Sequence, residues 1–75
     1  MTQSQTYGEK AVGLTFNPSG NQQVEEIKKH FAAIIDLLNE DRGENRNERA
    51  RLASVAITEA QTAQMWAVKA VTYES

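Results

Sequence analysis

Residues 46–71 constrain the fold of this chain more than any other part, because their apolar side chains are spread around most of a helix. The segment holds residues that favour helix strongly and let neighbouring backbones approach closely, namely Ala50, Ala53, Ala56, Ala60, Ala63, Ala67 and Ala70. Larger apolar residues occupy further sides of it: Leu52, Val55, Met65, Trp66 and Val68. A helix that is apolar over so much of its circumference is normally buried on several sides. One partner helix cannot cover it.

A second amphipathic helix is predicted upstream, over residues 21–40. Apolar residues recur there at steps of three and four, which places them on one face: Val24, Ile27, Phe31, Ile34 and Leu38, with Ile35 beside them. The connection to residues 46–71 is polar. The two segments therefore predict an antiparallel pair of helices.

Cap residues mark the predicted ends of both helices. Ser19 fits the first position of a capping box for the first helix, and Asn21 is an alternative cap. Gly43 is the predicted C-terminal cap of that helix. Asn45 with Glu48 repeats the capping-box pattern and is predicted to open the second helix.

The predicted fold is all-α, with a helical hairpin over residues 21–75 and a short N-terminal arm over residues 1–20, in a single domain. The arm is polar and has no helical period, so we expect little regular structure in it. A chain of 75 residues buries only roughly 60% of its unfolded surface and normally needs a disulfide, a metal or oligomerisation. Cysteine is absent, and the single histidine, His30, cannot form a zinc site alone. We therefore expect a compact homo-oligomer.

Composition disfavours several functions. The net charge of −2 and pI of about 5.3 disfavour a DNA or RNA coat, although a few local cations still suffice for a small anion. The first residues show no secretory-signal pattern, and no apolar run approaches the ~20 residues of a membrane span. We find no nucleophile set, phosphate loop or metal-ligand cluster. The sequence thus predicts an intracellular protein that is not an enzyme, with no cofactor, nucleic acid or membrane partner.

Four residues are candidates for binding, each with a structural alternative. Lys28 lies at the edge of the apolar face, where its stem can cover apolar surface or its ammonium can reach an anion at a subunit seam. Arg51 stands in the first turns of the second helix, where the helix dipole does not stabilise a cation. Tyr7 and Phe16 can anchor the arm or stack on a planar base. The residues alone leave these alternatives open.

Two stretches resemble a known hairpin domain. The first is residues 16–20, Phe-Asn-Pro-Ser-Gly, followed by Val24, Ile27 and Lys28. The second is residues 51–58, Arg-Leu-Ala-Ser-Val-Ala-Ile-Thr, followed by Gln-Met-Trp-Ala at residues 64–67. In this order and spacing they resemble the phage anti-CBASS cyclic-nucleotide sponges and the hairpin part of the anti-Thoeris sponges. The resemblance covers about residues 7–73.

The resemblance implies a phage protein that works in the host cell cytoplasm. Such proteins bind nucleotide second messengers of bacterial immune systems and sequester them without cleavage, which blocks the CBASS effector. They are homohexamers with pockets between protomers. The ligands implied are cyclic dinucleotides, with cyclic trinucleotides at a second kind of pocket and cyclised ADP-ribose (cyclic ADP-ribose signals) in the anti-Thoeris group. The anti-Thoeris proteins carry an additional N-terminal domain, so this chain resembles the stand-alone form.

The resemblance also implies ligand-binding residues. Lys28 matches a basic residue that contacts phosphate, and Arg51 matches an arginine that can reach a phosphate. Phe16, followed by Asn17 in the Phe-x-Pro pattern, matches an aromatic residue that packs on the base or sugar.

Two further positions match less closely. Tyr7 can stand for the arm tyrosine of the anti-CBASS group, but the interval from Tyr7 to Lys28 is longer than in that pattern, which makes Phe16 the alternative equivalent. Thr58 matches a family threonine, yet Ile57 stands where part of the family has an arginine. That departure weakens the case for a trinucleotide pocket.

The rival interpretation is a structural or regulatory helical module whose only partners are proteins. It explains the alanine-rich helix and the oligomer equally well. It gives no reason for Phe16, Lys28 and Arg51 to matter together.

Overall fold

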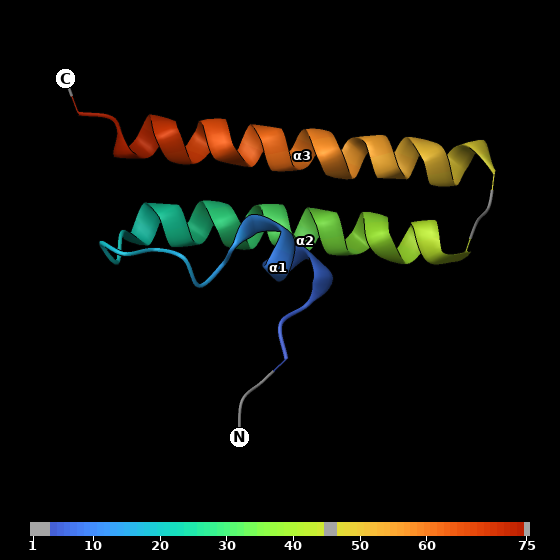
Figure 1. Cartoon of the computed structure of the whole chain (residues 1–75), viewed down its shortest axis with the longest axis horizontal. Coiled ribbons are helices and arrows are strands. Elements are labelled where there is room, and N and C mark those ends of the chain that lie inside the picture. The colour runs from blue at the N-terminus through green and yellow to red at the C-terminus, as the bar shows by residue number, and fades with distance from the viewer. Residues whose placement is uncertain (1–3, 45–46, 75) are drawn as a thin grey trace.

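The computed structural model describes residues 4–44 and 47–74, and that part of the chain contains three α-helices and no strand. They are α1 (Tyr7–Val12), α2 (Gln22–Glu44) and α3 (Glu48–Thr72). Helices α2 and α3 run antiparallel as a hairpin, and α1 lies against α2 (Figure 1). The prediction of an all-helical fold is confirmed for these residues. The prediction of an arm with little regular structure is wrong, because α1 lies within it.

Caps at both ends define α1. The Thr6 hydroxyl accepts a hydrogen bond from the Glu9 backbone N–H at 3.1 Å, and the Glu9 carboxylate accepts one from the Thr6 N–H at 2.9 Å. Gly13 ends the helix with φ of 63° and donates its N–H to the Lys10 carbonyl at 3.2 Å. This left-handed conformation suits glycine. Six residues are too few to show a helical period, which is why the apolar pattern did not predict α1.

The backbone of α1 docks directly on α2. The Gly8 N–H donates a hydrogen bond to the Asp36 carboxylate at 2.7 Å. A Cβ atom on Gly8 would lie 2.1 Å from the Ala32 carbonyl oxygen, so only glycine permits this approach. Val12, one turn later, is buried in the core. Helix α1 is therefore an integral part of the hairpin unit.

Helix α2 begins as one of the two alternatives predicted and ends later than predicted. Asn21 is the cap, since its side-chain oxygen accepts a hydrogen bond from the Val24 N–H at 3.1 Å. The helix continues past residue 40 and includes Gly43, which is not a C-terminal cap because its φ is not positive. The last turn is held by Arg42, which donates a hydrogen bond to the Ser54 hydroxyl of α3 at 3.3 Å. This tertiary contact outweighs the modest cost of glycine inside a helix.

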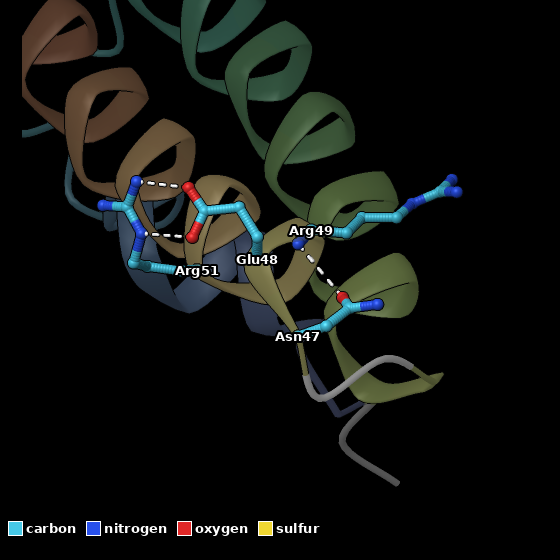
Figure 2. Close-up of polar contacts among 4 residues, drawn as sticks. All are labelled: Asn47, Glu48, Arg49 and Arg51. Atoms are coloured by element: carbon cyan, nitrogen blue, oxygen red, sulfur yellow. Dashed lines mark hydrogen bonds and ion pairs between the residues drawn. The ribbon is translucent and has the colours of Figure 1, made fainter.

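Helix α3 follows the prediction to within two residues at each end. Its N-terminal cap is Asn47, whose side-chain oxygen accepts a hydrogen bond from the Arg49 N–H at 3.0 Å (Figure 2). Asn45, predicted to cap this helix, lies outside the described residues. Within the residues that are described, no helix combines the length and the apolar character needed to cross a membrane.

The core lies where all three helices meet. Its buried residues are Val12, Ala32, Ile35 and Ile57, and Ile35 has no exposed surface. Val24 of the predicted apolar stripe is buried, whereas Ile34 is 48% exposed, so the prediction that the stripe forms one inward face is only partly correct. Ala32 and Ile35 of α2 lie in the core, whereas Ile34 faces outward.

The molecule is flat, with principal-axis extents of 44 × 37 × 12 Å. Its radius of gyration is 13.6 Å, against about 11 Å for a compact domain of this length. Its accessible surface is 5668 Å², against roughly 4600 Å² for a folded monomer of this mass. Large apolar side chains lie on that surface, among them Ile34, Leu37, Leu52, Val55, Met65 and Trp66. One layer of helices thus leaves apolar faces uncovered.

Candidate functional site

Lys28 lies at the centre of a cluster at the N-terminal end of α2. Its ammonium donates hydrogen bonds to the backbone carbonyls of Gly13, at 2.9 Å, and of Phe16, at 2.6 Å. The residue is only 5% exposed, so it is buried under the connection between α1 and α2 rather than lying at the edge of an apolar face. The ammonium nitrogen is 5.6 Å from the centroid of the Phe16 ring, and Phe16 is 73% exposed.

Asn17 braces the turn beside this cluster. Its side-chain N–H donates to the Asn21 carbonyl at 2.8 Å, and its side-chain oxygen accepts from the Asn21 N–H at 3.1 Å. Gly20 completes the turn with φ of 64° and donates its N–H to the Asn17 carbonyl at 3.0 Å. Because both polar groups of the Asn17 side chain are used within the turn, this residue orders the loop that carries Phe16. The structure thus brings Phe16, Asn17 and Lys28 together.

The cluster has the chemistry of an anion and base site. An ammonium has three N–H donors, and the described contacts of Lys28 use two of them, both toward neutral carbonyls. No carboxylate of the described residues lies within 4.0 Å of it. The exposed aromatic ring of Phe16 lies beside this cation. Such a ring can stack on a planar base while the ammonium contacts a phosphate. The described surface of a single chain holds no pocket.

Tyr7 lies away from Lys28. Its ring packs on the guanidinium of Arg42, with 5.3 Å between the Arg42 Cζ and the ring centroid. Arg42 follows Lys28 by fourteen residues, which is about 21 Å along α2 at ~1.5 Å per residue. Phe16, and not Tyr7, is therefore the aromatic residue beside Lys28.

Arg51 and Thr58 lie on α3, also apart from Lys28. Ser54 is level with Arg42 in the hairpin, so Arg51 lies beyond it, about 25 Å from Lys28 along the helix axes. Arg51 binds the Glu48 carboxylate with two N–H groups, at 2.9 and 2.6 Å (Figure 2). Thr58 is exposed. Lys28 and Arg51 of one chain are therefore too far apart to contact the same small ligand.

The ion pair of Glu48 and Arg51 gives a pH-dependent prediction. The hydrogen bonds from the Arg51 guanidinium lower the pKa of Glu48 from its ordinary 4.5, and a weaker desolvation effect opposes them. A lowered folded-state pKa contributes stability that is present above 4.5 and is lost as the pH falls through the folded-state value. We expect wild type to melt at a slightly higher temperature than Glu48→Gln. This difference should be constant at neutral pH and should shrink in acid. A difference that grows in acid would contradict this assignment.

Sequence reasoning missed two features of this region. Arg42 lies two heptads after Lys28 and one after Ile35, hence on the same side of α2, but the predicted helix ended before it. The Gly8–Asp36 contact joins residues 28 positions apart, and no local pattern announces such a contact. No group of three or more His, Asp or Glu side chains among the described residues can hold a metal ion.

The chain matches a known protein family. The family model described as "Acb2/Tad1, hairpin domain" matches residues 9–72. The matched part includes Phe16, Lys28, Arg51 and Thr58 and begins just after Tyr7. Searches of curated proteins and of solved structures found no match.

Proposed function

The chain belongs to the Acb2/Tad1 hairpin-domain family, and from that membership we propose that it is a phage anti-defence sponge for the cyclic nucleotides of bacterial immunity. It binds these second messengers in the host cytoplasm and withholds them from the CBASS effector without cleaving them. The observation that carries the proposal is the family match over residues 9–72, which is nearly the whole chain.

We further propose that the working form is a homohexamer. The flat protomer supports assembly, because its surface exceeds that of a folded monomer of the same mass by about 1000 Å², comparable to the ~800 Å² that each partner buries in a standard interface. The uncovered apolar side chains lie on both α2 and α3. Other copies of the chain are the partners that cover them.

Cyclic dinucleotides are the proposed ligands, and their shape suits a pocket between copies. Such a ligand carries two phosphate charges and two planar bases in an approximately two-fold arrangement. Two copies related by a two-fold axis present two Lys28 ammoniums and two Phe16 rings, one set for each half of the ligand. Exclusion of water at the seam strengthens each contact between ammonium and phosphate.

Recovery of the ligand tests sequestration without cleavage. The protein is incubated with cyclic GMP–AMP, unbound ligand is removed by filtration, and the protein is then denatured and the released nucleotide identified by chromatography. We expect intact cyclic GMP–AMP in amounts that follow the protein concentration. Recovery of linear or hydrolysed nucleotide would mean that the protein is an enzyme and not a sponge. Retention of no nucleotide from a panel of cyclic dinucleotides, trinucleotides and cyclic ADP-ribose would favour the module that binds only proteins.

Trp66→Glu is expected to dissociate the oligomer. Trp66 is 65% exposed in the protomer, and buried tryptophans at interfaces commonly contribute about 2–4 kcal/mol. Sedimentation velocity should show a shift toward monomer, since a carboxylate in an apolar seam leaves an unpaired charge. Gln23→Glu is the matched control, because it introduces the same charge at an exposed polar position. Equal sedimentation of wild type and Trp66→Glu would place Trp66 outside the interface.

A further inference from the structure

Arg42 joins all three helices from the last turn of α2. One guanidinium nitrogen donates a hydrogen bond to the Asn39 side-chain oxygen at 2.7 Å, and the other donates to the Ser54 hydroxyl of α3 at 3.3 Å. The guanidinium also lies over the Tyr7 ring of α1, with 5.3 Å between the Arg42 Cζ and the ring centroid. The side chain is partly buried and fixed in position by these contacts.

The charge of Arg42 is not matched by any carboxylate in the described part of the protomer. Its two acceptors are neutral, and no described Asp or Glu lies within 4.0 Å of it. The neighbouring arginines differ, since Arg49 pairs with Asp41 at 2.8 Å and Arg51 with Glu48 at 2.6 Å. A guanidinium has five N–H donors, of which two are used here. The three that remain, in a rigid planar group, fit the oxygens of a phosphate.

Tyr7 and Arg42 form a pair that resembles the pair of Phe16 and Lys28. Its ring is 45% exposed, so one face rests on Arg42 while part of the ring stays open to solvent. The position of the ring is set by the Thr6 cap and by the Gly8–Asp36 hydrogen bond. Each pair therefore combines an aromatic ring of the N-terminal segment with a cation of α2 that lacks a carboxylate partner. They lie about 21 Å apart along α2.

We propose that Arg42 binds a phosphate of the cyclic nucleotide, beside Tyr7, at a contact point separate from Lys28 and Phe16 of the same protomer. This inference rests on the proposed function. It gives the protein two cationic contacts per chain, so that a ligand held between copies is bound by guanidinium as well as ammonium. Among the described arginines, Arg42 can donate hydrogen bonds to a phosphate without first breaking an ion pair with a carboxylate. Arg49 and Arg51 would each have to break one.

The test compares Arg42→Met with Arg49→Met by titration calorimetry against cyclic GMP–AMP. Arg49 is the matched control because it lies at the same end of the hairpin and pairs with Asp41. We expect Arg42→Met to weaken binding at least tenfold and to make binding less sensitive to salt, since one charge contact is lost. Arg49→Met should bind as wild type does. Weakened binding with unchanged salt sensitivity would assign Arg42 a structural role and overturn the proposal.

Tyr7→Leu keeps the experiment decisive if Arg42→Met does not fold, because it leaves the bonds of Arg42 to Asn39 and Ser54 in place. We expect this variant to bind more weakly than wild type while its sedimentation and melting remain normal. If wild type binds and every folded variant binds with the same affinity, the proposal about Arg42 is overturned and the proposed function stands. Failure of wild type to bind any cyclic nucleotide would overturn the proposed function instead.

Discussion

Lys28→Met is expected to weaken cyclic-nucleotide binding strongly and to loosen the N-terminal segment. The ammonium holds the carbonyls of Gly13 and Phe16 at 2.9 and 2.6 Å, and methionine leaves both carbonyls without this donor. Hydrogen bonds to a charged group contribute about 1.5–3 kcal/mol each, partly offset here by the apolar replacement. We expect unfolding to become easier by about 2–3 kcal/mol. Loss of the phosphate contact should weaken binding by about 100-fold.

Lys29→Met is the control for this experiment. Lys29 is exposed, and its ammonium lies 3.8 Å from the Glu25 carboxylate in a surface ion pair, which contributes at most ~1 kcal/mol. Denaturant unfolding and calorimetry, at equal protein concentration, should separate the two neighbouring lysines clearly. If Lys28→Met bound ligand and unfolded as Lys29→Met does, Lys28 would have neither role.

Gly8→Ala is expected to destabilise the protein, whereas the same change at Gly43 should stabilise it. Both glycines lie inside helices. An added Cβ at Gly8 meets the Ala32 carbonyl oxygen at 2.1 Å and the Asp36 carboxylate at 2.9 Å, while at Gly43 it meets nothing within 4 Å. We expect a loss of about 2–3 kcal/mol at Gly8 from overpacking and the weakened bond to Asp36. At Gly43 we expect a gain of about 0.5–1 kcal/mol from helix propensity.

Hydrogen exchange would locate the effect of Gly8→Ala. Amides of α1 should lose protection while those in the middle of α3 keep most of it, because α1 docks on α2 through Gly8 whereas α3 makes most of its contacts with α2. A stabilising effect at both glycines would mean that α1 does not pack on α2 in solution.

The long helices were predictable because their signals are local. Periodic apolar residues and cap residues lie within a few positions of each other, and they placed α3 to within two residues and identified Asn21 as one of two possible caps of α2. Helix α1 has no such signal, since it is a short helix that depends on its caps at Thr6 and Gly13 and on docking through Gly8. The length of α2 depends likewise on a contact between Arg42 and Ser54.

The site was less predictable than the fold. Resemblance selected Phe16 and Lys28, but their contact exists only because the left-handed Gly13 turns the chain back over α2. Spacing suggested a lysine at the edge of the apolar face, and tertiary packing instead buried it against two carbonyls. Apolar patterns also cannot tell Ile34 from Ile35, since both are isoleucines next to each other on the predicted apolar face and only tertiary packing decides which one is buried.

Native mass spectrometry of the protein with cyclic GMP–AMP tests the central claim most directly, because it counts subunits and ligands together. We expect a homohexamer that gains whole-number increments of intact ligand, with fewer ligands bound by the Lys28→Met variant. A monomer, or an oligomer that gains no mass from cyclic dinucleotides, cyclic trinucleotides or cyclic ADP-ribose, would contradict it.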